Sequence, residues 1–385
     1  MEIIQVNNRQ TINEFHQLPI ALYKNDTNYT PQLRVMIEDI FSPEKNGKFK
    51  TGDAQRWIVK KDGECVGRIA AFFCEDYSKQ YSQPTGCCGF FESVDSNEVA
   101  FALFETAKKW LAENGMEAMD GPVNFGENFF YWGLLAEGFM PQTFGMQYNP
   151  PYYSRLFEDY GFKTFYEQYS YSLDIANPDL PERFWKIAAW IAKKPGYKYR
   201  HFTFKDQDIF IRDFIEIHAQ AWKSHGNYEP VRFEQLKQMI KQAGLMFEEE
   251  FIWYVYHNNK PIAFFMMLPD LNQIIRKLKT GKINLLTLFK IILYKRLKII
   301  NTCRVIVMGV IPQYQGMGIE SGIFYQLKKV MLCKKWYKNM EMGWVGDFNP
   351  KMNALFKSFG AKHKLTHLTL RYLFDREKEF TVLLN

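Results

Sequence analysis

A predicted strand rich in β-branched residues leads through a glycine-containing turn directly into a predicted helix in the segment Val305-Ile306-Val307-Met308-Gly309-Val310-Ile311-Pro312-Gln313-Tyr314-Gln315-Gly316-Met317-Gly318-Ile319. Two glycines, at 316 and 318, allow backbone amides to converge without side-chain obstruction. The helix that follows adds unpaired N–H groups and a positive dipole end, so the turn is suited to hold a pyrophosphate. A plain strand-to-helix turn is the alternative. The segment lacks the third glycine of a dinucleotide fingerprint and the Gly-Lys-Ser/Thr of a P-loop, so neither of those sites is expected.

The chain contains an internal repeat, in which Asn149–Gly161 recurs as Asn349–Gly360. Each copy predicts a short helix with proline in its first turn and glycine at its end, followed by a strand at 165–175 or 365–374. Further upstream, each half has a predicted hairpin, turning at Asp62-Gly63 or Asn258-Asn259, and a predicted long helix, at 97–114 or 318–335. The same order of elements in both halves indicates a duplicated α/β domain with a mixed, hairpin-based sheet.

The spacing Gln-x-x-Gly-x-Gly from Gln313 to Gly318 resembles the acyl-CoA-binding motif of the GNAT acetyltransferase superfamily. The order of elements over 200–375 and the helix at 349–360 are similar to that fold as well. The resemblance implies two tandem GNAT-like acyl-CoA N-acyltransferase domains in an α/β (α+β mixed sheet) fold. Residues 1–177 would form a degenerate N-terminal domain and 178–385 a C-terminal domain that retains the acyl-CoA motif.

The resemblance also implies a co-substrate, acetyl-CoA or another acyl-CoA, and a set of residues that contact it. The pyrophosphate would lie on the amides of Gln315–Ile319, and a backbone N–H near Val310 would polarise the thioester carbonyl. Asp347 is the first candidate for the catalytic base and Glu341 the second; a helix N-cap or solvated loop acid is the alternative for Asp347. The residues expected to bind the cofactor are Val310, Gln313, Gln315, Gly316, Met317, Gly318, Ile319 and Asn349.

Two departures from the pattern limit the expected chemistry. Phe356 occupies the position at which the family usually has a tyrosine that acts as the general acid, and phenylalanine has no proton to give. Phe157 occupies the matching position in the first half. The first half also has Cys87–Ser96, with acidic Glu92 and Asp95, where the glycine motif would be, so it is expected not to bind CoA. Its aromatic tract 128–135 is expected to line a pocket or to pack in the core.

The implied activity is N-acyl transfer to an amine, on a small molecule or a peptide. One alternative is a longer-chain acyltransferase that uses acyl carrier protein or works at a membrane surface. The other is a non-catalytic CoA-binding sensor or scaffold.

The net charge of +7 is concentrated in one segment, 271–304, which contains no Asp or Glu. The apolar spacing within 285–300 predicts a basic amphipathic helix, suited to an anionic membrane surface or to acyl carrier protein. A helix packed on the domain with a solvated basic face is the alternative. A nucleic-acid partner is not expected, because the positive charge is not spread over a domain. The Lys and Arg residues of this segment are Arg276, Lys277, Lys279, Lys282, Lys290, Lys295, Arg296, Lys298 and Arg304.

Other features exclude several classes of protein. The N-terminal residues have neither a basic nor an apolar signal-peptide region, and 283–300 carries too many charges for a membrane span. The six cysteines include no CxxC pair, so they are expected to be reduced and the protein cytoplasmic. His363 and His367 lie in a strand-like run and are expected to be structural, and no metal site is predicted.

Overall fold

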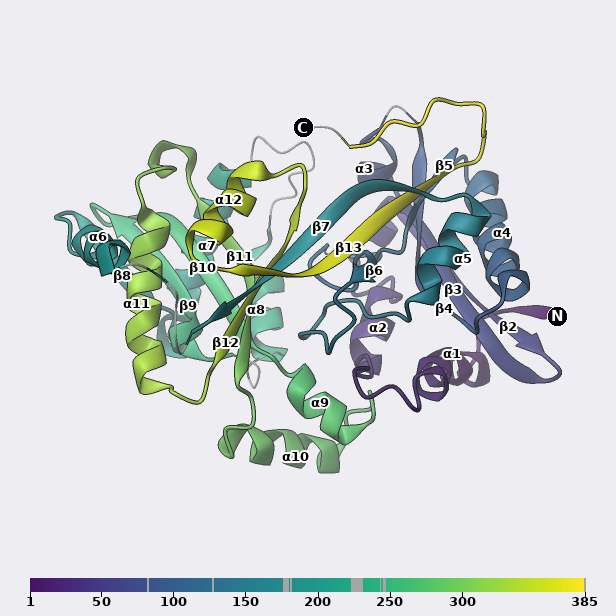
Figure 1. The fold of residues 1–385 in the computed structure, drawn as a ribbon, viewed down its shortest axis with the longest axis horizontal. Coiled ribbons are helices and arrows are strands. Elements are labelled where there is room, and N and C mark those ends of the chain that lie inside the picture. Colours follow the sequence, from purple (N-terminus) through teal and green to yellow (C-terminus); the bar gives the residue numbers. More distant parts are fainter. Residues whose placement is uncertain are drawn as a thin grey trace.

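The computed structural model describes residues 1–81, 83–126, 128–175, 180, 182–222, 231–242, 244 and 247–383. Its central feature is one continuous mixed sheet, with strands in the order β1-β2-β3-β4-β5-β13-β7-β12-β11-β10-β9-β8, while β6 pairs with β13 off this path (Figure 1). The mixed α/β fold predicted from the sequence is therefore confirmed. The predicted domain boundary between residues 177 and 178 lies outside the described residues.

The first half of the chain supplies seven strands and five helices among the described residues. Its strands are β1 (Glu2–Gln5), β2 (Gly52–Lys61), β3 (Glu64–Cys74), β4 (Thr85–Ser93), β5 (Ala118–Gly121), β6 (Leu134–Glu137) and β7 (Lys163–Asp174). Its helices are α1 (Arg9–Leu22), α2 (Arg34–Ile40), α3 (Glu75–Ser78), α4 (Asn97–Glu113) and α5 (Tyr152–Tyr160), with a short 3₁₀ turn, η1 (Gly47–Lys50).

The second half repeats this order and adds helices to it. Its strands are β8 (Tyr197–His201), β9 (Ile252–His257), β10 (Lys260–Pro269), β11 (Thr302–Val310), β12 (Asn339–Gly346) and β13 (Lys362–Leu373). Its helices are α6 (Glu182–Ala192), α7 (Gln207–Trp222), α8 (Phe233–Gln242), α9 (Asn272–Leu278), α10 (Leu285–Arg296), α11 (Ile319–Cys333) and α12 (Pro350–Ser358). Three 3₁₀ turns are η2 (Phe204–Asp206), η3 (Glu249–Phe251) and η4 (Pro312–Tyr314).

The local turn chemistry agrees with the sequence predictions. β2 and β3 form a hairpin around Asp62 and Gly63, both of which have positive φ, and β9 and β10 do the same around Asn258 and Asn259. Asparagine, aspartate and glycine tolerate this left-handed conformation, which two-residue hairpins require. Helix α5 ends at Gly161, whose φ is +107°.

The two halves exchange their last strands. β4 and β5 are parallel in the first half, as are β11 and β12 in the second. However, β5 is completed by β13 from the C-terminus, and β12 is completed by β7 from the first half. β7 and β13 run antiparallel beside each other across the middle of the molecule (Figure 1). Each half of the sheet is therefore built from both halves of the chain.

The hydrophobic core reflects this exchange. One buried cluster fills the first half between the sheet and α4 and α5, and it includes Leu370 and Tyr372 from β13. A larger cluster fills the second half, and it includes Tyr171 and Leu173 from β7. A third, smaller cluster lies under α1 and α2. No helix in the described part of the chain is long and apolar enough to cross a bilayer.

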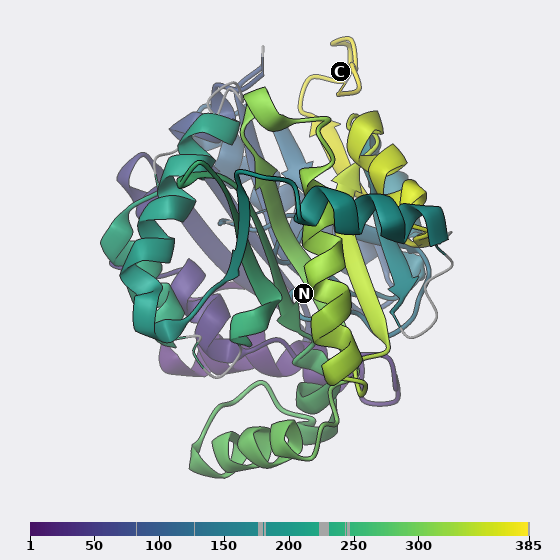
Figure 2. The same ribbon diagram turned by 90° about the vertical axis from the view of Figure 1, so that its left-hand side faces the viewer.

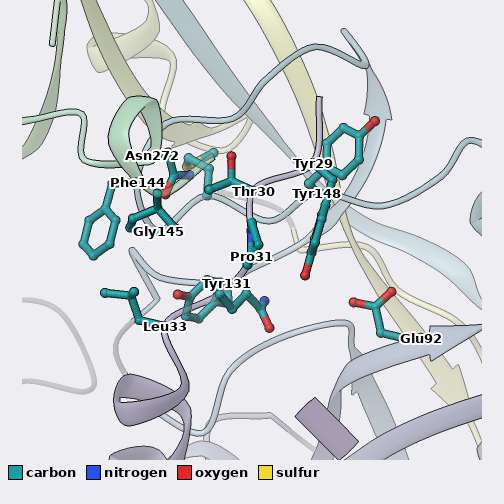
Figure 3. A pocket seen from close by; sticks show the side chains of 13 residues that line it. Tyr29, Thr30, Pro31, Leu33, Glu92, Tyr131, Phe144, Gly145, Tyr148 and Asn272 are labelled. Atoms are coloured by element: carbon teal, nitrogen blue, oxygen red, sulfur yellow. The ribbon is translucent and has the colours of Figure 1, made fainter. Parts of the chain in front are cut away.

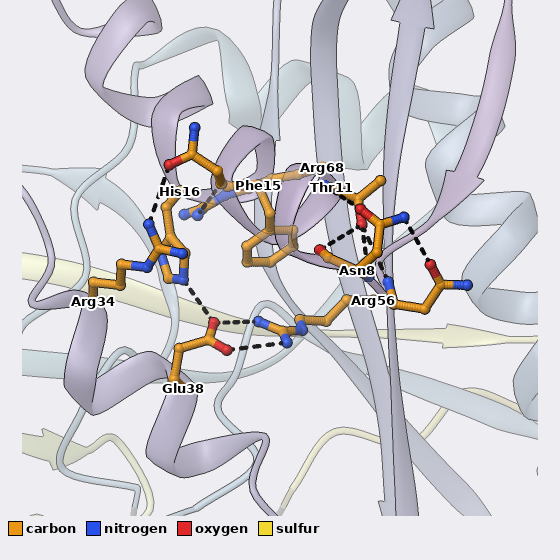
Figure 4. A network of polar contacts seen from close by, with 10 residues as sticks. Asn8, Thr11, Phe15, His16, Arg34, Glu38, Arg56 and Arg68 are labelled. Carbon is orange, nitrogen blue, oxygen red and sulfur yellow. Dashed lines mark hydrogen bonds and ion pairs between the residues drawn. The ribbon is translucent and has the colours of Figure 1, made fainter.

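Polar contacts attach α1 and α2 to the first half of the sheet (Figure 4). Glu38 on α2 accepts hydrogen bonds from His16 of α1 at 2.7 Å and from Arg56 of β2 at 2.6 Å. Burial opposes ionisation of Glu38, but these two partners outweigh it and hold its pKa down at about 2. The N-cap Asn8 and Thr11 form a capping box that begins α1.

Candidate functional site

The glycine turn predicted from the sequence connects β11 to α11. Gly316 and Gly318 both adopt the left-handed conformation, with φ of +75° and +77°, and Gly318 is the N-cap of α11. A Cβ at Gly316 would meet no atom of the chain within 4 Å, so its backbone faces open space. The first N–H groups of an α-helix have no intrahelical partner and favour an anion. Gln313 and Met317 are exposed beside them, and Ile319 is buried.

Several contacts fix this turn from behind. The Gln315 side chain donates to the Val310 carbonyl at 3.1 Å, and the Tyr314 hydroxyl lies 2.7 Å from His257 Nδ1. Helix α6 lies across the N-terminal end of α11 (Figure 2), and a Cβ on Gly318 would come within 2.6 Å of the Ile191 side chain. The turn is therefore held in place by β9, β11 and α6.

The strands that carry the turn separate from each other just before it. β11 and β12 are paired only from Thr302↔Asn339 to Val305↔Met342. Beyond that point β11 stays with β10 as far as Val310, and β12 stays with β7 as far as Gly346. A wedge thus opens between β11 and β12 along 306–310, and it leads to the glycine turn.

The two acidic candidates lie in different environments. Asp347 is exposed just after β12, and its carboxylate accepts the Phe348 amide at 2.8 Å. Glu341 is 2% exposed within the paired part of β12, where it forms an ion pair with Lys364 and accepts a 2.6 Å hydrogen bond from Thr143. Asp347 is therefore accessible to a substrate, whereas Glu341 is already engaged by the fold. Both assignments as catalytic bases stay predictions.

Helix α12 places the remaining expected residues beside the wedge. Asn349 is its exposed N-cap and accepts the Met352 amide at 3.1 Å. Phe356 is buried, as its aromatic ring packs 5.8 Å from that of Tyr171. The Tyr171 hydroxyl donates to Asn353 at 2.9 Å, and burial raises the pKa of this phenol, which keeps it protonated.

Sequence reasoning did not find Tyr171, although it is a proton donor close to Phe356. The residue belongs to β7, in the first half of the chain, and it reaches α12 only through the exchanged strand, where Tyr171 is paired with Met342. No local pattern in the sequence signals that pairing.

The corresponding place in the first half has no glycine turn. β4 is followed almost at once by α4, and Arg155 forms ion pairs there with Asp95 and Asp159. Asn149, the counterpart of Asn349, is buried and holds both the amide and the carbonyl of Leu135. These residues are committed to contacts within the chain.

Glu92, the other acid at this place, is buried beside a narrow cavity between the two halves (Figure 3). Its carboxylate accepts hydrogen bonds from the hydroxyls of Tyr23 at 2.6 Å and Tyr153 at 2.8 Å, and it contacts Arg68 at 3.3 Å. Burial is the main cause that raises its pKa. Tyr131 of the aromatic tract lines the same cavity, whereas Trp132 is buried and donates to the Tyr166 hydroxyl.

A second buried polar group joins the halves near Glu341. Arg304 on β11 donates to the carbonyls of Phe144 at 2.7 Å and Phe129 at 2.9 Å, both in first-half loops. Asp270 accepts the Phe144 amide at 2.8 Å; its burial, and secondarily Glu341, raise its pKa to about 7. Within the described ranges, no group of three or more His, Cys, Asp or Glu residues is arranged to hold a metal ion.

Sequence similarity to two known proteins extends over nearly the whole chain. No protein-family profile matches it. A protein of Escherichia coli K12 named YghO is 25% identical over 360 residues, which cover 92% of this chain and 91% of YghO. A bacterial ceramide synthase of Caulobacter vibrioides is 24% identical over 379 residues, which cover 95% of this chain and 96% of the synthase.

Known structures resemble this one over both halves. A tandem GNAT protein from the clavulanic acid biosynthesis pathway gives a TM-score of 0.59 at 10% identity, covering 98% of this chain and 99% of its own. A GCN5-related N-acetyltransferase from Sphaerobacter thermophilus gives 0.53 at 11% identity, with 99% and 98% covered. The chain therefore has the fold of the tandem GNAT proteins.

Proposed function

We propose that the chain is an N-acyltransferase whose acyl-CoA donor binds to the second half alone. The observation that carries this proposal is the wedge between β11 and β12 that opens into the left-handed glycine turn at the N-terminus of α11. An extended thioester arm fits beside a strand edge, and a pyrophosphate fits convergent backbone amides at a helix N-terminus. The first half has no glycine turn after β4, and Glu92 near the end of β4 is buried among hydrogen-bonding partners.

The chain supplies groups to bind the donor, to stabilise the developing negative charge and to deprotonate the amine. The amides of Gln315–Ile319 hold the pyrophosphate, and the N–H groups along 306–310 hold the arm and stabilise negative charge on the thioester oxygen. Asp347, directly or through water, takes a proton from the amine as the new C–N bond forms. The sulfur leaves as the thiolate as the C–S bond breaks, because Phe356 has no proton to give and the Tyr171 hydroxyl beside it is buried and donates to Asn353.

The proposed acceptor is a long-chain amino alcohol. This part of the proposal is supported by the relative named as a bacterial ceramide synthase, which aligns over 95% of the chain. Ceramide formation joins a fatty acyl group to the amino group of such a base. Acetyl and longer acyl groups are both to be tested as donors, as is acyl carrier protein in place of CoA.

The donor site can be tested by calorimetric titration with acetyl-CoA and palmitoyl-CoA. Gly316→Ala places a methyl group in the open space above the turn, where it displaces a ligand but no atom of the chain. Gly63→Ala is the matched control, because Gly63 also has positive φ, +83°, with open space around it, and lies in the first-half hairpin. Both variants should lose a similar free energy of unfolding, about 1 kcal/mol.

The expected result is that only Gly316→Ala weakens binding, by about 10- to 100-fold, which corresponds to one or two hydrogen bonds to a charged group. Equal affinities in the two variants, or no binding by the wild type, would contradict the proposal. Tight binding with no free thiol released in the presence of any amine would instead support the non-catalytic sensor, which the phenylalanine at 356 favours.

A further inference from the structure

Helix α10 presents a continuous row of large apolar side chains to solvent. Leu285 is 88% exposed, and Leu286, Phe289 and Leu297 are each more than 60% exposed. Positions 286, 289, 293 and 297 are spaced three or four residues apart, so their side chains lie along one face of the helix. Soluble proteins seldom expose a contiguous apolar surface. The α10 face consists of Ile283, Leu285, Leu286, Phe289, Leu293 and Leu297.

The opposite side of α10 is anchored to the protein, so this exposure is a property of a well-seated helix. Ile291 and Tyr294 pack against the second-half core, and Thr287 is buried in a capping box with Asn284. The preceding loop is fixed to the first half, because the Gly281 carbonyl accepts the Arg34 amide at 3.0 Å. From the sequence, a helix packed on the domain with a solvated basic face was the alternative to a membrane- or carrier-binding helix; in the structure the face turned outward is rich in leucine and phenylalanine.

Cations surround the α10 face. By helical position, exposed Lys290 lies on one side of the apolar row and exposed Arg296 on the other, while Lys282 precedes the helix and Lys298 follows it. Arg296 and Lys298 also line a groove at the C-terminal end of α10, together with three acids, Glu248, Glu249 and Glu250. Two of them, Glu248 and Glu250, are paired with Lys334 there, and Glu249 accepts the Phe204 amide.

We propose that the α10 face docks on an anionic lipid bilayer, with the helix lying in the plane of the interface. A projecting helix enters a lipid interface without a shaped partner groove (Figure 2), and its flanking cations then meet the anionic headgroups. A second copy of the chain is disfavoured because pairing two such faces brings like charges together. An acidic carrier protein would satisfy the cations but not the exposed row of leucine and phenylalanine. At 12 residues the helix is too short to span the bilayer.

This inference does not rest on the acyltransferase proposal. α10 precedes β11, whereas the glycine turn follows the far end of that strand. Substitutions on the α10 face should therefore leave the affinity for acetyl-CoA unchanged, and vesicle binding needs no turnover. Either proposal can fail without the other.

The test is co-sedimentation of the full-length chain with phosphatidylcholine vesicles, with and without about one third phosphatidylglycerol. We expect binding to the anionic vesicles that weakens as salt is added. Leu286→Gln combined with Phe289→Gln should weaken it about 100-fold, from the lost apolar burial. Lys290→Gln combined with Arg296→Gln should weaken it about 30-fold. Leu332→Gln, at a residue 60% exposed on α11, is the matched control and should bind like the wild type.

Three results would overturn the proposal. The first is that anionic vesicles bind the wild type no better than they bind the Leu286 and Phe289 double variant, which includes the case in which neither protein binds. The second is self-association in sedimentation velocity that this double variant abolishes, without vesicle binding. The third is binding to acidic acyl carrier protein in place of vesicles. All of the substituted side chains are exposed, so the unfolding midpoint should not change, and this is checked first.

Discussion

Replacing Arg371 with leucine tests whether the exchanged strand β13 is held in the first half as the structure shows. Arg371 donates to both carboxylate oxygens of Asp120 on β5, each at 2.7 Å, and both residues are buried. The guanidinium carbon also lies 3.6 Å from the ring centre of Phe165 and 4.1 Å from that of Tyr81. Removing one partner of a buried, hydrogen-bonded pair leaves the other charge without compensation.

The expected loss of unfolding free energy in Arg371→Leu is about 4 kcal/mol, within the range for a broken buried pair. The double variant Asp120→Leu with Arg371→Leu should be more stable than the single variant, because it leaves no isolated carboxylate. Urea unfolding followed by tryptophan fluorescence measures both effects.

Lys378→Leu is the control for this experiment. Its partner Glu117 lies at the same end of the first half, but both side chains are more than 40% exposed. An exposed ion pair contributes little, so the change should stay below about 1 kcal/mol. If Arg371→Leu were no more destabilised than Lys378→Leu, or if the double variant were the least stable of the three, β13 would not be held by this pair.

Further expected outcomes concern the site and the junction. The pKa of Asp270 is raised to about 7, first by burial, so the folded chain holds this proton more tightly than the unfolded chain; the resulting stability is present below about pH 4 and is lost as pH rises towards 7. In Asp270→Asn the unfolding free energy should fall less between pH 4 and 7 than in the wild type. If the urea midpoints of the two proteins changed equally from pH 4 to 8, this prediction would be wrong. Asp347→Asn should lower kcat by about 100-fold at unchanged acyl-CoA affinity if the residue is the base, since its carboxylate is exposed. Tyr171→Phe should leave kcat unchanged, because the Tyr171 hydroxyl is buried and bonded to Asn353; a large fall in kcat would instead make this phenol the acid. Asn349→Ala removes a helix cap and should lower the unfolding free energy by about 1 kcal/mol, whereas Asn149→Ala, which breaks buried bonds to Leu135, should lower it by about 3 kcal/mol in denaturation measurements.

Features controlled by local backbone geometry could be predicted from the sequence. The hairpin turns at Asp62-Gly63 and Asn258-Asn259, and the turn with Gly316 and Gly318, need positive φ, which few residue types tolerate. The residue types at these positions therefore predict the turns without information on contacts between distant parts of the chain. The duplicated order of helices and strands followed from the same local signals, and the resemblance of the Gln313–Gly318 motif to that of the GNAT superfamily then indicated the fold.

The candidate site was only partly accessible to such reasoning. The sequence placed the glycine turn correctly and ranked Asp347 before Glu341 as the base, but it could not show the surroundings of either carboxylate. Only the fold shows that Glu341 is engaged by Thr143, almost 200 residues away, and by Lys364, while Asp347 faces solvent. Tyr171 could not be recognised, since its proximity to Phe356 depends on the pairing of β7 with β12.

The sequence by itself thus determined the duplicated fold and the position of its glycine turn, because turn residues and hydrophobic periodicity act over a few neighbouring positions. The tertiary structure alone decided which strand completes each half and which face of α10 meets solvent. Strand order depends on pairings between residues far apart in the chain, such as Asp120 with Arg371. The exposed face of α10 depends on which side the core covers, and a helix with large apolar side chains on two sides, such as Phe289 and Ile291, does not encode that choice.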